Sequence, residues 1–178
     1  PGYREEEKVA PDSTTETYGA FTFHIDNWRW QGVPFYLRTG KRMPVKVSEI
    51  TVLFHDPPHQ FFPAAAVENW QQNRIVIRIQ PEEGIGTRIQ VKQPGTRMLL
   101  GTAEMRFRYD EAFRTPAPEA YETLLLDVIR GDATLFMRAD QIESAWEVVS
   151  PILHAWDAVP AAGLSEYAAG TWGPESAD

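Results

Sequence analysis

Alternating apolar and polar residues predict a series of β-strands in the first two thirds of the chain. Over residues 18–25, Phe21, Phe23 and Ile25 alternate with smaller or polar side chains, as expected for a strand whose neighbouring residues point to opposite faces. Similar alternation occurs over residues 33–39, 47–55, 73–81, 87–92 and 103–109. The residues between these segments are typical of turns, including glycines 84 and 86, so the strands are expected to be antiparallel.

The last third of the chain has helical periodicity. Apolar residues recur three and four positions apart from Tyr121 to Ile129, and Gly131 provides a C-terminal stop. A second apolar stripe reaches Trp156 and is preceded by a pair that resembles a capping box, Asp140 and Glu143. We therefore predict an α+β fold, with a large, mostly antiparallel β-sheet and helices packed on one face. Its other face would need a partner domain or a second subunit to cover it.

Composition narrows the classes of partner. The chain of 178 residues has a formal net charge of -8, which argues against nucleic acid as the principal partner. Its length suits one compact domain. It has no cysteine, which is compatible with a reducing cytoplasm, and no apolar run of membrane-spanning length or signal peptide. Because it begins at Pro1, we expect a fragment or a processed product.

A basic loop departs from this acidic background. Arg38, Lys41, Arg42 and Lys46 lie within nine positions of one another, and such a local cluster indicates a small anionic ligand. Gly40 and proline 44 interrupt any continuous strand, so a bend here would let Lys41 and Lys46 converge on one phosphate or sugar. The alternative is a solvated turn whose lysines keep a sheet edge soluble.

Two further features allow different interpretations. Trp28 and Trp30 have the spacing of an aromatic platform for a sugar ring, although packing against a neighbouring element is the interpretation we favour. His55 and His59, with Asp56 between them, superficially suggest metal ligands, but their spacing matches no established pattern and the two adjacent prolines indicate a loop. We therefore predict no metal site.

Several motifs occur in the order found in one known family. The motifs are Pro1-Gly-Tyr-Arg-Glu-Glu-Glu7, Pro11-Asp-Ser-Thr-Thr-Glu-Thr-Tyr18, Asp26-Asn-Trp-Arg-Trp30, Gly32-Val-Pro-Phe-Tyr-Leu-Arg-Thr-Gly-Lys-Arg42, Ile75-Val-Ile-Arg-Ile-Gln-Pro81, Glu119-Ala-Tyr-Glu-Thr-Leu-Leu-Leu-Asp127 and Thr134-Leu-Phe-Met-Arg-Ala-Asp140. Over nearly its whole length the chain resembles the C-terminal domain of glucose-6-phosphate dehydrogenase, in its bacterial form. That enzyme oxidises glucose 6-phosphate to the lactone and reduces NADP.

The resemblance implies that substrate binding and cofactor binding are assigned to different domains of the parent protein. Lys41, Lys46 and Gln80 match family positions that contact glucose 6-phosphate. The family's catalytic histidine motif, Asp-His-Tyr-Leu-Gly-Lys, and its glycine-rich dinucleotide loop do not occur, so no catalytic residue is assigned in this chain. Residues 1–178 are thus expected to be a C-terminal substrate-binding and dimerisation domain. The N-terminal dinucleotide-binding domain, which binds most of the NADP, is expected to precede it.

The resemblance also bears on a second cofactor, on assembly and on location. Eukaryotic members bind a structural NADP on this domain, and Arg38, Arg78 and Arg88 keep its basic character, but Val47 replaces an expected lysine and the family's aromatic C-terminal tail is absent. Arg38 and Arg78 are therefore only secondary candidates for cofactor contact. We expect a cytoplasmic homodimer or homotetramer formed through the sheet, without nucleic-acid or membrane partners. The alternatives are a non-catalytic assembly module, or a sugar-binding module that uses exposed indoles.

Overall fold

The computed structural model describes residues 2–59, 61–68, 70–113, 120–158 and 165–177. The chain divides into two compact units, which we describe separately. The first consists of Pro1–Val45 and Asp127–Asp178, and the second of Lys46–Leu126. In the described ranges, no helix is long and apolar enough to cross a membrane.

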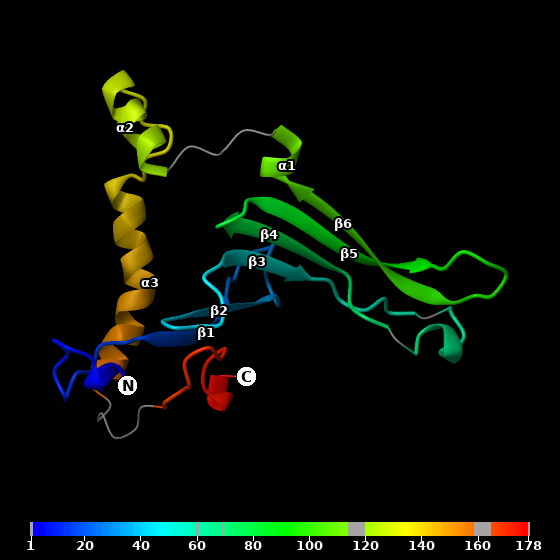
Figure 1. Cartoon of the computed structure of the whole chain (residues 1–178), viewed down its shortest axis with the longest axis horizontal. Coiled ribbons are helices and arrows are strands. Elements are labelled where there is room, and N and C mark those ends of the chain that lie inside the picture. Colours follow the sequence, from blue (N-terminus) through cyan, green and yellow to red (C-terminus); the bar gives the residue numbers. More distant parts are fainter. Residues whose placement is uncertain (1, 60, 69, 114–119, 159–164, 178) are drawn as a thin grey trace. The chain divides into compact units, whose positions relative to one another are not determined.

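The first unit is built on a two-stranded antiparallel sheet and one long helix (Figure 1). Its elements are the 3-10 helix η1 (Tyr3–Glu5), strands β1 (Tyr18–His24) and β2 (Pro34–Gly40), helix α3 (Ala139–Asp157) and the 3-10 helix η4 (Glu175–Ala177). Helix α2 (Ala120–Arg130) crosses the boundary between the units and ends before Gly131, whose φ of 70° suits glycine. The predicted helix over this segment is confirmed.

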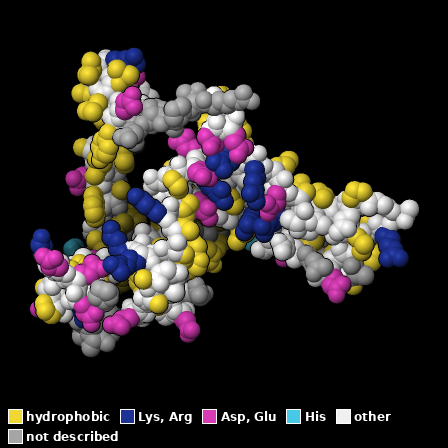
Figure 2. Space-filling model, viewed as in Figure 1, with side chains coloured by type: hydrophobic (Ala, Val, Ile, Leu, Met, Phe, Trp, Pro, Cys, Tyr) yellow, Lys and Arg dark blue, Asp and Glu magenta, His cyan; other side chains and the backbone are white. Residues whose placement is uncertain are grey.

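The alternation predicted for β1 accounts for its contact with α3. Phe21 and Phe23 are less exposed than their neighbours Ala20, Thr22 and His24. The Phe21 ring stacks on Trp156 of α3, with centroids 5.3 Å apart and an interplanar angle of 21°. The amphipathic helix therefore packs its C-terminal end against one face of the hairpin. Hydrophobic side chains line much of the rest of α3 (Figure 2), and Trp146 is 56% exposed.

The second unit is a four-stranded antiparallel sheet whose strands follow their order in the chain. Its elements are β3 (Ser48–Leu53), the 3-10 helix η2 (Ala64–Ala66), β4 (Arg74–Gln80), β5 (Gly84–Lys92), β6 (Leu100–Arg108) and the short helix α1 (Tyr109–Phe113). The register gives the sheet two unlike faces. The apolar face carries Ile50, Val52, Ile75, Ile77, Ile79, Ile85, Met105 and Phe107, and the other face carries Arg74, Arg78, Arg88, Arg106 and Arg108.

The α+β class and the antiparallel strands are confirmed, but the described strands form two sheets where one large sheet was expected. Residues 41–47 have no strand structure. Gly40 precedes this break, Arg42 within it adopts a positive φ of 51°, and Pro44 lacks an N–H donor for a ladder. The bend predicted after Gly40 is therefore present.

Three local predictions were wrong. Glycines 84 and 86 lie inside β5 and do not bracket a turn, because a Cβ on Gly84 would lie 2.5 Å from the Phe107 carbonyl oxygen of the paired strand, so the close approach needs glycine. Tyr109 begins helix α1 and does not extend β6. Helix α3 is capped before Asp140, with the N–H of Arg138 donating to the Gln141 side chain at 3.1 Å.

Candidate functional site

Lys41 stands at the end of the two-stranded sheet, and its backbone is bonded on both sides. Its N–H donates to the Thr17 carbonyl oxygen at 2.8 Å. Its own carbonyl oxygen accepts a hydrogen bond from the Tyr167 hydroxyl at 2.7 Å. The Lys41 side chain is exposed. A fixed backbone that carries an exposed lysine side chain is suited to binding an anion or sugar hydroxyls.

Arg42 continues this arrangement with a strained backbone and an ion pair. Its φ of 51° is uncommon for a residue with a Cβ, and its carbonyl oxygen accepts a hydrogen bond from the Gly170 N–H at 2.8 Å. Its guanidinium lies 3.0 Å from the Glu6 carboxylate. The Arg42 side chain thus has a partner within the protein, and the neighbouring Lys41 side chain is exposed.

Residues 165–177, which we call the C-terminal strap, pass over the open end of the hairpin. Arg38 of β2 donates to the carbonyl oxygens of Trp172 at 3.2 Å and Ala177 at 2.9 Å. The Tyr18 hydroxyl also donates to the Trp172 carbonyl oxygen at 3.2 Å. Nothing in the sequence analysis indicated this connection. The signals that could have indicated it were Gly170 and Gly173, both of which have positive φ.

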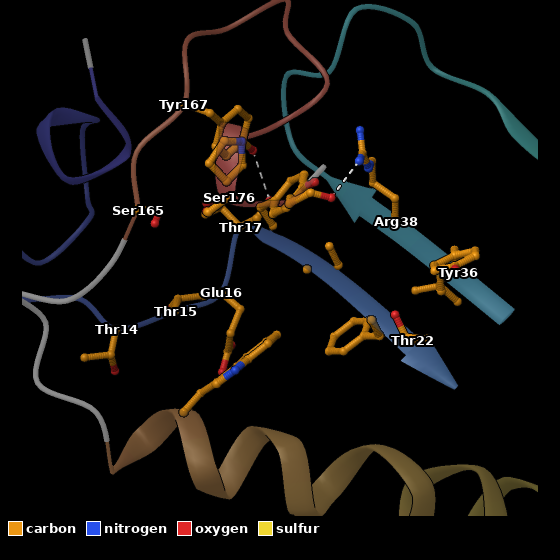
Figure 3. Close-up of a pocket in the computed structure, with 18 residues that line it drawn as sticks. Thr14, Thr15, Glu16, Thr17, Thr22, Tyr36, Arg38, Ser165, Tyr167 and Ser176 are labelled. Carbon is orange, nitrogen blue, oxygen red and sulfur yellow. Dashed lines mark hydrogen bonds between the residues drawn. The ribbon is translucent and has the colours of Figure 1, made fainter. Parts of the chain in front are cut away.

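A hollow of about 860 Å³ lies between the strap, the hairpin and the end of α3 (Figure 3). Hydroxyl groups from residues 14, 15, 17, 22, 165 and 176 line it, together with Glu16. Figure 3 shows Tyr167 above Thr17, and Arg38 reaching from β2 toward the strap. The Arg38 guanidinium is bonded to strap carbonyls.

Lys46 and Gln80 belong to the second unit. Gln80 pairs with Ser48 in the sheet register, and its side-chain amide donates to the Ser48 hydroxyl at 2.9 Å. Lys46 is two residues before Ser48, so Lys46 and Gln80 belong to the same end of the four-stranded sheet. Both side chains are exposed. A bulge between Ser48 and Glu49 shifts the register at this end. Convergence of Lys46 with Lys41 on one ligand stays a prediction.

On the arginine face of the same sheet, Arg78, Arg88, Arg106 and Arg108 form ion pairs. Figure 2 shows Lys and Arg side chains gathered over this sheet with acidic groups beside them. Glu104 accepts hydrogen bonds from Arg106 at 2.6 Å and from Arg88 at 2.9 Å, and these bonds, led by that of Arg106, lower the pKa of its carboxyl below the usual 4.5. Arg78, a secondary candidate, lies 3.9 Å from Glu49.

The remaining candidates differ in outcome. Trp30 packs edge-on against Phe35 at 5.2 Å, as expected, whereas Trp28 is 88% exposed and has the Arg29 guanidinium over its ring at 5.6 Å. Packing was therefore the wrong expectation for Trp28. Asp56 accepts a hydrogen bond from the Trp70 indole at 2.7 Å. Across the described ranges, no three or more His, Cys, Asp or Glu side chains are grouped to hold a metal ion.

Comparison with known proteins identifies the family. The family model for the C-terminal domain of glucose-6-phosphate dehydrogenase matches residues 1–178. Glucose-6-phosphate 1-dehydrogenase of Aggregatibacter actinomycetemcomitans is 48% identical over 99% of this chain and 35% of its own length. Glucose-6-phosphate 1-dehydrogenase 2 of Mycobacterium bovis is also 48% identical, over 98% of this chain and 34% of its own length. The chain thus spans about a third of the length of the curated relatives it matches.

Solved structures agree with this fold. A crystal structure of glucose-6-phosphate 1-dehydrogenase from Mycobacterium avium matches 99% of this chain and 36% of its own, with a TM-score of 0.80 and 36% identity. A glucose-6-phosphate dehydrogenase solved in complex with its substrate glucose-6-phosphate matches 98% of this chain and 35% of its own, with a TM-score of 0.83 and 33% identity. The chain belongs to the family of glucose-6-phosphate dehydrogenase C-terminal domains.

Proposed function

We propose that this chain contributes the phosphosugar-binding part of an NADP-dependent glucose-6-phosphate dehydrogenase, with Lys41, Lys46 and Gln80 contacting glucose 6-phosphate. The observation that carries the proposal is the exposed Lys41 side chain on a backbone bonded at both its N–H and its carbonyl. Support comes from Gln80 at the sheet end near Lys46, and from a relative solved with glucose-6-phosphate.

Each proposed contact has a physical role. A lysine ammonium is a compact charge with three donors, which suits phosphate oxygens and sugar hydroxyls. The Gln80 side chain both donates and accepts, so it can read the hydroxyls of the ring while its amide stays oriented by Ser48. Together these residues bind and orient the sugar for hydride transfer. They do not supply the base.

The chemistry itself is assigned to another part of the enzyme. Oxidation at the anomeric carbon needs a base to accept the hydroxyl proton while hydride passes to the nicotinamide. We expect a preceding dinucleotide-binding domain to supply that base and most of the NADP contacts. Arg38 and Arg78 remain secondary candidates for cofactor contact, and both already have partners within the protein.

The proposal includes self-association in the cytoplasm, as a homodimer or homotetramer formed through the sheet. The apolar face of the four-stranded sheet supports it, because Ile77, Ile79, Ile85, Met105 and Phe107 are all exposed. Monomeric proteins rarely leave such a contiguous apolar face in contact with water. Self-association alone would also suit the alternative of a non-catalytic assembly module, which tolerates loss of Lys41.

Substrate binding separates these functions. In the full-length gene product, we would measure the Kd for glucose 6-phosphate by calorimetry and its KM for Lys41→Ala, Lys46→Ala and Gln80→Ala. We expect each lysine variant to weaken binding by about tenfold or more, and the glutamine variant by about threefold to tenfold, because charged hydrogen bonds are stronger than neutral ones.

Lys92→Ala is the matched control. Lys92 lies at the opposite end of β5 from the Gln80 end of the sheet, and its ammonium donates to the Gln93 and Gly95 carbonyl oxygens. We expect it to bind glucose 6-phosphate normally. Unchanged binding in all three site variants, in a protein that still self-associates, would favour the assembly module.

A further inference from the structure

We propose that Tyr167 is a positioning residue for Lys41. Its hydroxyl, 126 positions later in the sequence, donates a hydrogen bond to the Lys41 carbonyl oxygen and so fixes the position of the lysine backbone. The inference rests on the proposed role of Lys41 in binding glucose 6-phosphate. It concerns a residue whose hydroxyl touches the backbone of the lysine proposed to bind the substrate.

The hydrogen bonds around Lys41 form a closed arrangement. The Tyr167 hydroxyl lies 2.7 Å from the Lys41 carbonyl oxygen and 3.3 Å from the Thr17 carbonyl oxygen. That Thr17 oxygen also accepts the Lys41 N–H at 2.8 Å. One hydroxyl therefore lies against both the residue before β1 and the residue after β2. The shorter distance makes the Lys41 carbonyl its principal acceptor.

Lys41 needs an external restraint because its neighbours permit several backbone conformations. Gly40 precedes it, and glycine has the widest backbone freedom of any residue. A larger residue is excluded at this position, since a Cβ on Gly40 would lie 2.7 Å from the Tyr18 ring. The order of the loop therefore comes from its hydrogen bonds. A binding group displaced by about 1 Å loses much of its effect.

The strap orients the Tyr167 hydroxyl before any ligand binds. The Tyr167 ring packs against Tyr18, with centroids 5.1 Å apart, and is half-buried. Two more residues fasten the strap: Gly170, whose N–H donates to the Arg42 carbonyl, and Arg38, which donates to the Trp172 and Ala177 carbonyls. The Trp172 carbonyl therefore keeps a donor when the Tyr18 hydroxyl is removed. Figure 3 shows the tyrosine lying directly over the start of β1. Replacement by phenylalanine would keep this packing and remove only the hydroxyl.

The test uses Tyr167→Phe in the full-length gene product, with Tyr18→Phe as the matched control. Both variants remove one hydroxyl that donates to a backbone carbonyl in the strap region, but only Tyr167 bonds to Lys41. We expect Tyr167→Phe to raise the KM for glucose 6-phosphate by about threefold to tenfold, the usual size of one hydrogen bond. The KM for NADP and the thermal midpoint should match those of Tyr18→Phe.

A double variant separates positioning from general support. In a Lys41→Ala background, Tyr167→Phe should raise the KM no further, because the side chain that it positions is gone. Equal KM values for Tyr167→Phe and Tyr18→Phe, or an additive effect in the double variant, would overturn the inference and leave the role of Lys41 intact. An unchanged KM in Lys41→Ala alone would overturn both the inference and the proposed function.

Discussion

The two sheets of this chain are held together in different ways. The four-stranded sheet pairs strands that follow one another in sequence, so each ladder forms between close neighbours. The two-stranded sheet also pairs neighbours, but its open end is hydrogen-bonded to the strap and Phe21 in the middle of β1 stacks on Trp156 of α3. These contacts join residues more than a hundred positions apart. The local residue pattern is therefore enough to specify the four-stranded sheet. The arrangement around the two-stranded sheet depends on contacts between distant parts of the chain.

The largest predicted effect comes from Gly173→Ala. Gly173 has a φ of 121°, and a Cβ there would enter the Tyr18 ring. Strain and overlap together should lower the free energy of unfolding by about 3 kcal/mol. Hydrogen exchange should then accelerate for amides of β1 and β2 but not for those of β4 to β6.

Gly32→Ala is its control, because Gly32 has a φ of 80° with nothing within 4 Å of a Cβ. It should lower the free energy of unfolding by only about 1 kcal/mol. If the two variants are equally stable, the strap does not depend on the Tyr18 contact.

Trp156→Ala should be the next most destabilising. It removes the ring that stacks on Phe21 and leaves that face of the hairpin uncovered. We expect a loss of about 2 kcal/mol in thermal or denaturant unfolding, less than for a fully buried tryptophan. Trp146→Ala, on the same helix and 56% exposed, should change stability by about 0.5 kcal/mol or less. A larger effect at Trp146 would mean that a partner covers this part of α3.

Gly84→Ala tests the other sheet. The new Cβ would press on the Phe107 carbonyl, and separating β5 from β6 there should lower the free energy of unfolding by about 1 to 2 kcal/mol. Gly86→Ala is the matched control, because it makes the same substitution in the same strand but no atom lies within 4 Å of the new Cβ. It should leave the free energy of unfolding unchanged or raise it slightly. In Gly84→Ala, amide hydrogen exchange should accelerate in β5 and β6 and not in β1. Accelerated exchange in both sheets would show that the two are coupled.

The smallest predicted effect is on the stability of the protein at acidic pH. The pKa of Glu104 is lowered by its hydrogen bonds with Arg106 and then Arg88, so the folded protein binds this proton less readily than the unfolded chain does. The resulting stabilisation is fully present above pH 4.5 and is lost as the pH falls through the lower, folded-state pKa. Because solvent screens this group, the effect is small. Glu104→Gln should make acid unfolding less steep below pH 4.5, measured by circular dichroism.

The sequence predicted most of the second unit because side-chain alternation reports directly on strands. Its failures have physical causes. Gly84 was interpreted as a turn residue because glycine marks both turns and close strand contacts, and only the position of Phe107 in the paired strand distinguishes them. Tyr109 continued the alternation of β6 although its N–H bonds to the Glu83 carbonyl and a helix begins there.

The substrate contacts proposed for Lys41, Lys46 and Gln80 come from a basic loop and a sequence motif, and they stay predictions. Tyr167 comes from neither, because it acts on a backbone carbonyl, which any residue at position 41 would present. Its partner is 126 positions away, and such a bond has no periodicity that a single sequence would show.

The distance between Lys41 and Tyr167 in the sequence also means that they are synthesised at different times. Lys41 leaves the ribosome 126 residues before the tyrosine that secures it. At about 5–20 residues per second, the loop waits roughly 6–25 s for its partner. A nascent or prematurely terminated chain therefore carries the lysine without the bond that positions it. The proposed contact of Lys41 with a phosphosugar would therefore gain its backbone support only after the strands of both sheets have been synthesised.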